Sequence, residues 1–140
     1  MQFEALGRPA PQGSKRLVTT RSGRTAMIET SARLKPWRSV VASAAVEAGA
    51  RVTDAPVSLS IVARYQRPAS HLKRDGTART GAPIRPSYGD ADKLARAICD
   101  ALSGVAYRDD RQVALLRVER RWCEDGEAEG AIIELCELTS

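Results

Sequence analysis

The stretch Ser87-Tyr-Gly-Asp-Ala-Asp-Lys-Leu-Ala-Arg-Ala-Ile-Cys-Asp-Ala-Leu-Ser-Gly-Val-Ala-Tyr-Arg-Asp-Asp-Arg-Gln-Val113 decides how this chain is organised. It contains five aspartates, and between residues 92 and 103 its apolar residues recur at the spacing of one helix face. Asp90 is a suitable N-cap and Gly104 a suitable residue to end the helix. The stretch therefore predicts an amphipathic helix with carboxylates before and after it.

The aspartates at the two ends of this helix are expected to meet. A helix of about twelve residues rises roughly 18 Å, and the six residues that follow it would span about 20 Å if extended. If the chain reverses after the helix, Asp109 and Asp110 return to the level of Asp90 and Asp92. Carboxylates gathered in this way need a cation among them, and we therefore expect a magnesium site.

The length and composition of the chain exclude several classes of protein. With 140 residues it is most simply one domain, residues 1–140. No apolar run approaches the roughly 20 residues of a spanning helix, and residues 1–7 do not form a signal peptide, so we expect no membrane contact and an intracellular location. Three cysteines without Cys-x-x-Cys spacing and a single histidine argue against zinc sites and Cys–His or Ser–His–Asp catalysis, and we expect reduced thiols in or near the core.

The charge of the chain is polarised. Its net charge is +5, but residues 1–89 contain fifteen Lys/Arg against five Asp/Glu, whereas residues 90–140 contain seven against twelve. A basic half beside an acidic cluster fits a protein that holds a polyanion with one part and a metal ion with the other. The alternative from charge alone is an arginine-rich solvated surface.

The remaining pattern predicts an α+β domain with a mixed β-sheet and two main helices. A helix is expected from Pro36 to about Ala48, with Trp37 in the core rather than stacked on a base. Strands are expected at residues 1–7, 17–28 (a hairpin), 57–65, 112–122 and 130–138, the last two as an antiparallel pair.

Two segments without periodicity carry basic residues that suit DNA. Residues 8–16 form either a phosphate-contacting loop or an ordinary basic turn, and residues 67–89 form a long basic loop that we expect to be mobile and to fold over nucleic acid. His71 lies in this loop as a solvated residue. The candidate DNA-binding residues are Lys15, Arg16, Arg21, Arg24, Arg67, Lys73, Arg74, Arg79, Arg85 and Lys93.

Three motifs carry a family resemblance. They are Asp90-Ala-Asp92, Asp100-Ala-Leu-Ser-Gly104 and Asp109-Asp-Arg-Gln-Val113, in this order and spacing. Together they resemble the signature of the RusA family of Holliday junction resolvases. Residues 7–16, Gly-Arg-Pro-Ala-Pro-Gln-Gly-Ser-Lys-Arg, are also similar to the amino-terminal loop of many members.

The resemblance implies a RusA-like fold and a homodimeric, Mg²⁺-dependent endodeoxyribonuclease of DNA recombination and repair, with Mn²⁺ as a substitute metal. Such an enzyme binds four-way DNA junctions, nicks two strands symmetrically, and is cytoplasmic and nucleoid-associated in a bacterium or encoded by a phage. The residues it assigns to the metal are Asp90, Asp92 and Asp110, with Asp109 beside them. The chemistry agrees, because carboxylate-held Mg²⁺ hydrolyses phosphodiesters without histidine or cysteine.

The chain departs from the family pattern at two positions. The family's catalytic lysine falls on Arg96, and Lys93 stands where asparagine is usual. Arginine keeps a cation one turn from Asp92 but cannot donate a proton, a role that Lys93 could take over. The alternatives are a catalytically weakened branched-DNA-binding protein or a nuclease for other branched or flap DNA. Asp100 is expected to pair with a neighbour such as Arg96 rather than to bind metal.

Overall fold

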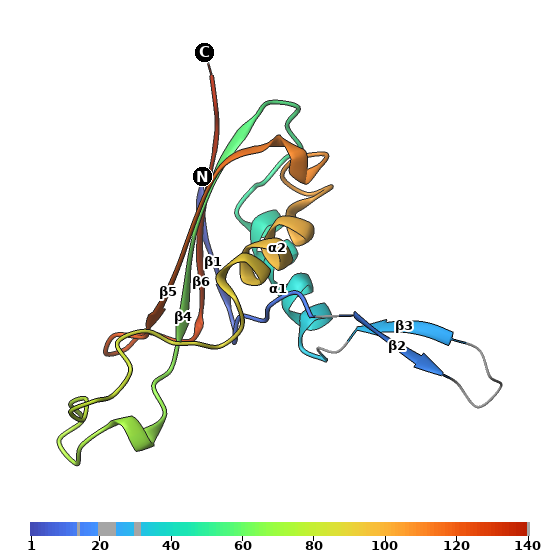
Figure 1. Ribbon diagram of the computed structural model, residues 1–140. Helices are drawn as coiled ribbons and strands as arrows, with labels where there is room; N and C mark the ends of the chain where they lie inside the picture. Colours follow the sequence, from blue (N-terminus) through green and yellow to red (C-terminus); the bar gives the residue numbers. More distant parts are fainter. Residues whose placement is uncertain (14, 20–24, 30–31, 140) are drawn as a thin grey trace.

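A computed structural model of the chain describes residues 1–13, 15–19, 25–29 and 32–139 (Figure 1). The described part is one α+β domain with a four-stranded mixed sheet, a separate hairpin and two main helices, so the predicted fold class is confirmed. The elements in chain order are β1 (Gln2–Leu6), β2 (Lys15–Thr19), β3 (Thr25–Glu29), α1 (Leu34–Glu47), β4 (Val57–Tyr65), η1 (Ala69–His71), α2 (Ala91–Leu102), η2 (Asp110–Gln112), β5 (Val113–Trp122) and β6 (Gly130–Glu137).

The order of strands in the main sheet is β1-β6-β4-β5. β4 pairs in parallel with β5 and antiparallel with β6, and Ile61 is opposite both Val118 and Ile133. β1 pairs antiparallel with β6. β5 and β6 are therefore not neighbours, and the prediction that they form an antiparallel pair is wrong. The alternation of apolar residues marks the buried face of a strand, but it does not identify the strand's neighbours.

Both main helices cover the same face of this sheet (Figure 1). β4 directs Leu59 and Ile61 into the interface, and α2 contributes Leu94 and Ile98 from its apolar side. Trp37 of α1 is only 3% exposed, which confirms that it belongs to the core. Apolar burial on this one face is the main source of stability, because neither of the described main helices covers the opposite face of the sheet.

Two segments extend away from the domain beyond the sheet (Figure 1). One is the β2–β3 hairpin, in which Leu17 is opposite Met27. The other is segment 66–89, which leaves the end of β4 and leads into α2. It contains η1 and a bridge between Leu72 and Ala78, so it is more regular than the sequence predicted.

The ends of α2 and the surface agree in part with expectation. Asp90 is the N-cap residue and Gly104 has φ +82°, as predicted.

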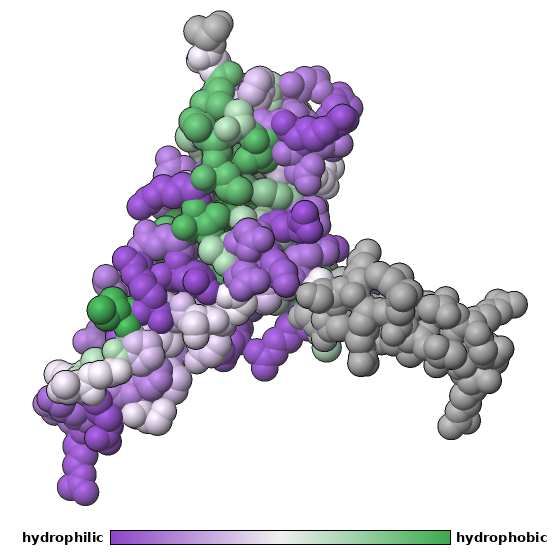
Figure 2. All heavy atoms as spheres, in the orientation of Figure 1, coloured by the Kyte–Doolittle hydropathy of each residue, from purple (hydrophilic) through white to green (hydrophobic). Residues whose placement is uncertain are grey.

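The cysteines are free thiols, but Cys136 is exposed rather than near the core. Exposed apolar residues include Leu115 and Leu116 of β5, and Figure 2 shows apolar residues gathered along this part of the sheet. No helix in the described ranges is long and apolar enough to cross a membrane.

Candidate functional site

Asp90 and Asp92 lie at the start of α2 with exposed side chains. The Asp90 side chain does not bond a backbone N–H of the first turn. Its carboxylate lies 3.6 Å from Nζ of Lys93 instead. The positive end of the helix dipole favours negative charge here, which stabilises both carboxylates as anions. Both carboxylates therefore face solvent from which a cation can approach.

The N-terminal loop, residues 7–13, holds the segment that precedes α2. Gly89 has φ +64°, and a Cβ atom there would lie 2.7 Å from Cγ of Pro11. The Gln12 N–H donates to the Lys93 carbonyl at 3.0 Å. Only glycine fits at position 89, because of both the left-handed backbone and the contact with Pro11. Sequence reasoning missed this contact, since no local pattern links the two segments.

Arg8 and two tyrosines form a stack beside Gly89. The guanidinium carbon of Arg8 lies 4.3 Å from the centre of the Tyr88 ring and 5.8 Å from that of Tyr65. The two rings are 5.1 Å apart, centre to centre. Burial raises the pKa of Tyr65 to about 12, so its hydroxyl stays neutral. The stack fixes the orientation of Arg8 relative to the segment that carries Asp90.

Segment 66–89 is fastened to β5 through Trp122. The indole N–H of Trp122 donates to the Pro83 carbonyl at 3.0 Å, and the guanidinium carbon of Arg67 lies 4.9 Å from the centre of the Trp122 ring. The ring of His71 meets Trp122 edge-on, 5.5 Å away, so His71 is half-buried rather than the solvated residue that was predicted. The predicted mobility of this segment stays a prediction.

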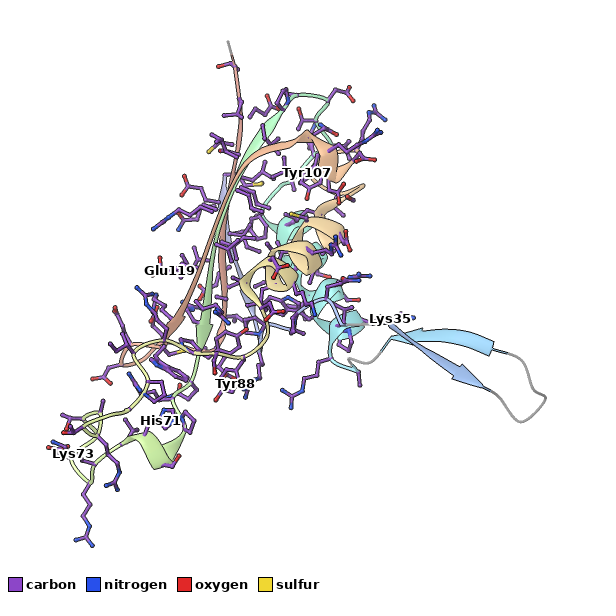
Figure 3. All side chains as sticks on the ribbon, viewed as in Figure 1. Lys35, His71, Lys73, Tyr88, Tyr107 and Glu119 are labelled. Atoms are coloured by element: carbon purple, nitrogen blue, oxygen red, sulfur yellow. The ribbon has the colours of Figure 1, made fainter. Side chains whose placement is uncertain are left out.

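The predicted DNA-binding cations differ in their surroundings. Lys73, Arg74 and Arg79 are exposed on segment 66–89, and Lys73 lies near the outer end of this segment (Figure 3). Arg67 stacks on β5 as described, and Arg85 forms an ion pair of 2.9 Å with Glu119 of the same strand. The cations whose side chains lie outside the described part of the chain are Lys15, Arg16, Arg21 and Arg24.

The second aspartate pair, Asp109 and Asp110, belongs to a capping box around η2. The Asp109 carboxylate accepts from the Arg111 backbone N–H at 2.9 Å, and the Gln112 side chain accepts from the Asp109 backbone N–H at 3.0 Å. Nε2 of Gln112 also donates to two carbonyls that precede β4, at 2.8 and 2.9 Å. The glutamine therefore fixes the turn that carries both aspartates.

The pKa values of the two carboxylates of this pair are shifted in opposite directions. Partial desolvation and the neighbouring carboxylates of Asp109 and Asp100 raise the pKa of Asp110. The hydrogen bond from the Arg111 backbone N–H lowers the pKa of Asp109. A cation beside Asp110 would favour its ionised form by opposing the repulsion from Asp109 and Asp100, which adds to the effect of desolvation.

The structure does not bring the two aspartate pairs together within one chain. The Gly104 N–H donates to the Tyr107 carbonyl at 2.7 Å, so the chain forms a tight turn and the predicted extended return is wrong. Figure 3 places Tyr88 and Tyr107 at opposite ends of α2. In the described ranges, no group of three or more His, Cys, Asp or Glu side chains could hold a metal ion.

The remaining charged residues of α2 have different partners from those expected. Asp100 pairs with Arg38 at 3.1 Å rather than with Arg96. Arg38 also donates to the Gln12 side chain at 2.6 Å and thereby ties α1 to the N-terminal loop. Arg96 is exposed, one turn after Asp92, and forms no ion pair with another described residue. Its guanidinium is therefore available to an anion such as a phosphate.

The aspartate motifs, their spacing and their positions around α2 agree with the comparison against known families. Residues 7–134, most of the chain, match the family described as Endodeoxyribonuclease RusA. The chain belongs to the RusA endodeoxyribonuclease family. It is therefore a DNA-cutting enzyme of the Holliday junction resolvase class, and nucleases of the RusA family depend on metal ions. No curated protein was similar enough to the chain to count as a match.

The RusA match spans every part of the site described above. It begins at the N-terminal loop that packs on Gly89, includes both aspartate pairs, and ends within β6. Sequence reasoning included Arg8 and Pro11 in the loop 8–16, but it missed their contacts with Tyr88 and Gly89, because these contacts join distant segments. Gly89 directly before Asp90 was the one local signal, since glycine permits the left-handed backbone found there.

Proposed function

We propose that this RusA-family protein is a Mg²⁺-dependent Holliday junction resolvase that nicks two strands of a four-way DNA junction symmetrically, as a homodimer, in DNA recombination and repair. The observation that carries the proposal is the family match over residues 7–134, which includes both aspartate pairs. Mn²⁺ is expected to substitute for Mg²⁺. The enzyme would act in the cytoplasm, on nucleoid or phage DNA.

The donor chemistry of the aspartates suits Mg²⁺, which prefers carboxylate oxygens. Asp90 and Asp92 lie at one end of α2 and Asp110 near the other, and a helix of 12 residues is about 18 Å long. We therefore assign the metal ligands to two protomers: Asp90 and Asp92 of one, with the partner's Asp110 and Asp109 beside it. A bound metal supplies activation of water and neutralisation of charge on the phosphate.

The surface that we assign to the second protomer is the free edge of β5. Leu115 and Leu116 of this strand are 61% and 51% exposed, and β5 pairs with another described strand, β4, on one side alone. α2 contacts β5 and runs in the opposite direction (Figure 1). A two-fold axis at this edge would set the two copies of α2 side by side and antiparallel. Each aspartate pair would then approach the complementary pair of the partner, which gives two sites for two symmetric nicks.

We assign the scissile phosphate to Arg96. Its exposed guanidinium lies one helical turn after Asp92, where a charged fork can bind phosphate oxygens. Because arginine stays protonated, this contact is electrostatic rather than a proton transfer. Lys93, whose Nζ lies 3.6 Å from the Asp90 carboxylate, is a cation beside this site that could donate a proton to the leaving oxygen.

We assign the arms of the junction to the basic residues of the two extending segments. Lys73, Arg74 and Arg79 present exposed cations on segment 66–89, with Arg67 and Arg85 at its base. Lys15, Arg16, Arg21 and Arg24 belong to the hairpin region and are assigned from sequence. Phosphate contacts of this kind give strong, salt-dependent binding without reading sequence.

A second candidate function follows from Lys93 and Arg96, the two positions next to the site where the chain departs from the family pattern. With Arg96 in place of lysine, and Lys93 paired to Asp90, the protein would bind branched DNA and cleave it slowly. A nuclease for flaps or other branched DNA is the alternative within the enzymes.

One experiment separates these functions. The protein is incubated with a fixed four-way junction, a flap and a linear duplex, each with Mg²⁺ or with EDTA. Symmetric nicks in the junction alone, abolished by EDTA, are the expected result. Binding without nicking supports the weakened binder, and preferential flap cleavage supports the alternative nuclease. Nicking that persists in EDTA contradicts the metal assignment.

A further inference from the structure

Ile84 presents its apolar side chain to solvent from segment 66–89. It is 85% exposed, more than any other large apolar residue in the described part of the chain. Single apolar residues on a protein surface are common and need no function by themselves. Ile84 differs from such residues because the backbone on both sides of it is held in place.

Both chain neighbours of Ile84 are bonded to β5. The Pro83 carbonyl accepts a hydrogen bond from the Trp122 indole N–H at 3.0 Å. The Arg85 guanidinium donates to the carboxylate of Glu119, which Figure 3 labels, at 2.9 Å. The sheet therefore fixes the position at which Ile84 is displayed. Little conformational entropy is lost when a side chain held in this way meets a ligand.

Arg120 of β5 connects Ile84 to the candidate metal site. Its backbone carbonyl accepts a second hydrogen bond from Arg85, at 3.1 Å, and its guanidinium donates to the carbonyl of Gly89, the residue before Asp90. The chain from Ile84 to Asp90 can span at most about 20 Å, which is the length of about six base pairs of DNA. Ile84 is therefore held within a few base pairs of a phosphate bound at Asp90.

The charge of the segment suits nucleic acid better than a second copy of the same surface. Segment 66–89 contains five Lys/Arg against one Asp, and Lys73, Arg74 and Arg79 are exposed. A second copy of the segment beside Ile84 would bring like charges together, whereas DNA phosphates would neutralise them. The edge of β5 also lies at the proposed two-fold axis, and a symmetric complex places the branch of a four-way junction on that axis.

We propose that Ile84 packs on the face of a base pair at the branch of a DNA junction and thereby selects branched over linear DNA. In a continuous duplex, every base pair is stacked on both sides, so an apolar side chain must unstack a step before it can enter. The stack is interrupted at a branch, and a base there can be covered without this cost. The inference rests on the proposed function and adds a residue that selects the substrate by its shape.

The test compares Ile84→Ala with the parent protein in binding to a fixed four-way junction and to a linear duplex, both in EDTA. Each buried methylene contributes about fourfold to an equilibrium constant, so the loss of three carbons, about half of them buried, should weaken junction binding about tenfold. Affinity for the duplex should stay within about twofold. Ile84→Phe should keep the preference for the junction, since an aromatic ring also stacks on bases.

Val46→Ala is the matched control, because Val46 is 61% exposed on α1 and has no part in the proposed site. It should bind both DNAs as the parent does. An Ile84→Ala variant that keeps the junction affinity, or loses equally on junction and duplex, would overturn the proposal. A weaker dimer in sedimentation analysis of Ile84→Ala would also overturn it, because the side chain would then contact the second protomer. A parent without preference for the junction would refute the proposed function itself, a result distinct from a loss confined to the role of Ile84.

Discussion

Gly89→Ala tests whether packing of the N-terminal loop positions the start of α2. An L-residue at φ +64° costs about 1–2 kcal/mol. The new Cβ would also lie 2.7 and 2.9 Å from Cγ and Cβ of Pro11, so the loop or the segment before α2 must move. Adding the cost of overpacking, we expect the free energy of unfolding to fall by about 2–5 kcal/mol. Asp90 is the next residue, so nicking should slow as well.

Gly126→Ala is the control that measures the cost of a left-handed backbone without a steric clash. Gly126 has φ +80°, and nothing lies within 4 Å of the Cβ that alanine would add. The free energy of unfolding measured with urea should therefore fall by about 1–2 kcal/mol in this variant, clearly less than in Gly89→Ala. Pro11→Gly in the Gly89→Ala background should recover part of the difference as a favourable coupling energy. Equal losses for the two alanine variants, without recovery, would refute the packing argument.

Three further perturbations address the second aspartate pair, the sheet and the phosphate contact. Gln112→Ala removes the hydrogen bonds that fix the η2 turn, so the free energy of unfolding measured with urea should fall by about 1–3 kcal/mol and nicking should slow. An unchanged nicking rate would contradict the role of this turn. Glu127 has its pKa lowered to about 2, chiefly by the Arg121 side chain, so its ion pairs stabilise the fold above the ordinary value of 4.5 and are lost as the pH falls toward 2. Glu127→Gln should flatten the pH dependence of stability in this window, and a profile unchanged from the parent would argue against it. If the contact is electrostatic, the nicking rate of Arg96→Lys should stay within about threefold of the parent rate. A much faster rate would assign a proton-donor role to this position.

The helix α2 and the strand β4 could be predicted from sequence because both carry strong local periodicity. The apolar residues of α2 repeat on one face between Asp90 and Gly104, which mark its two ends. In β4, alternate residues such as Leu59 and Ile61 are buried. The motif residues of the site were also visible, since their chemistry and spacing are local properties of the chain.

The order of strands and the position of Asp110 could not be predicted in this way. Strand pairing depends on which edges meet in space, and β6 lies between β1 and β4 although it follows β5 in sequence. Asp110 stays near the far end of α2 because the turn at Gly104 is closed by backbone hydrogen bonds, which the residue types alone do not specify. The stack of Arg8 on Tyr88 joins two segments far apart in the chain and has no local signal.

The most direct test of the proposed two-protomer site is subunit complementation between Asp90→Asn and Asp110→Asn, refolded together with different affinity tags and purified as mixed dimers. In a mixed dimer, one site combines the intact Asp90 of one variant with the intact Asp110 of the other, while the second site lacks both carboxylates. We predict that each variant alone does not nick a fixed four-way junction and that the mixed dimer nicks one strand when Mg²⁺ is present. A mixed dimer as inactive as its parents would contradict the two-protomer site.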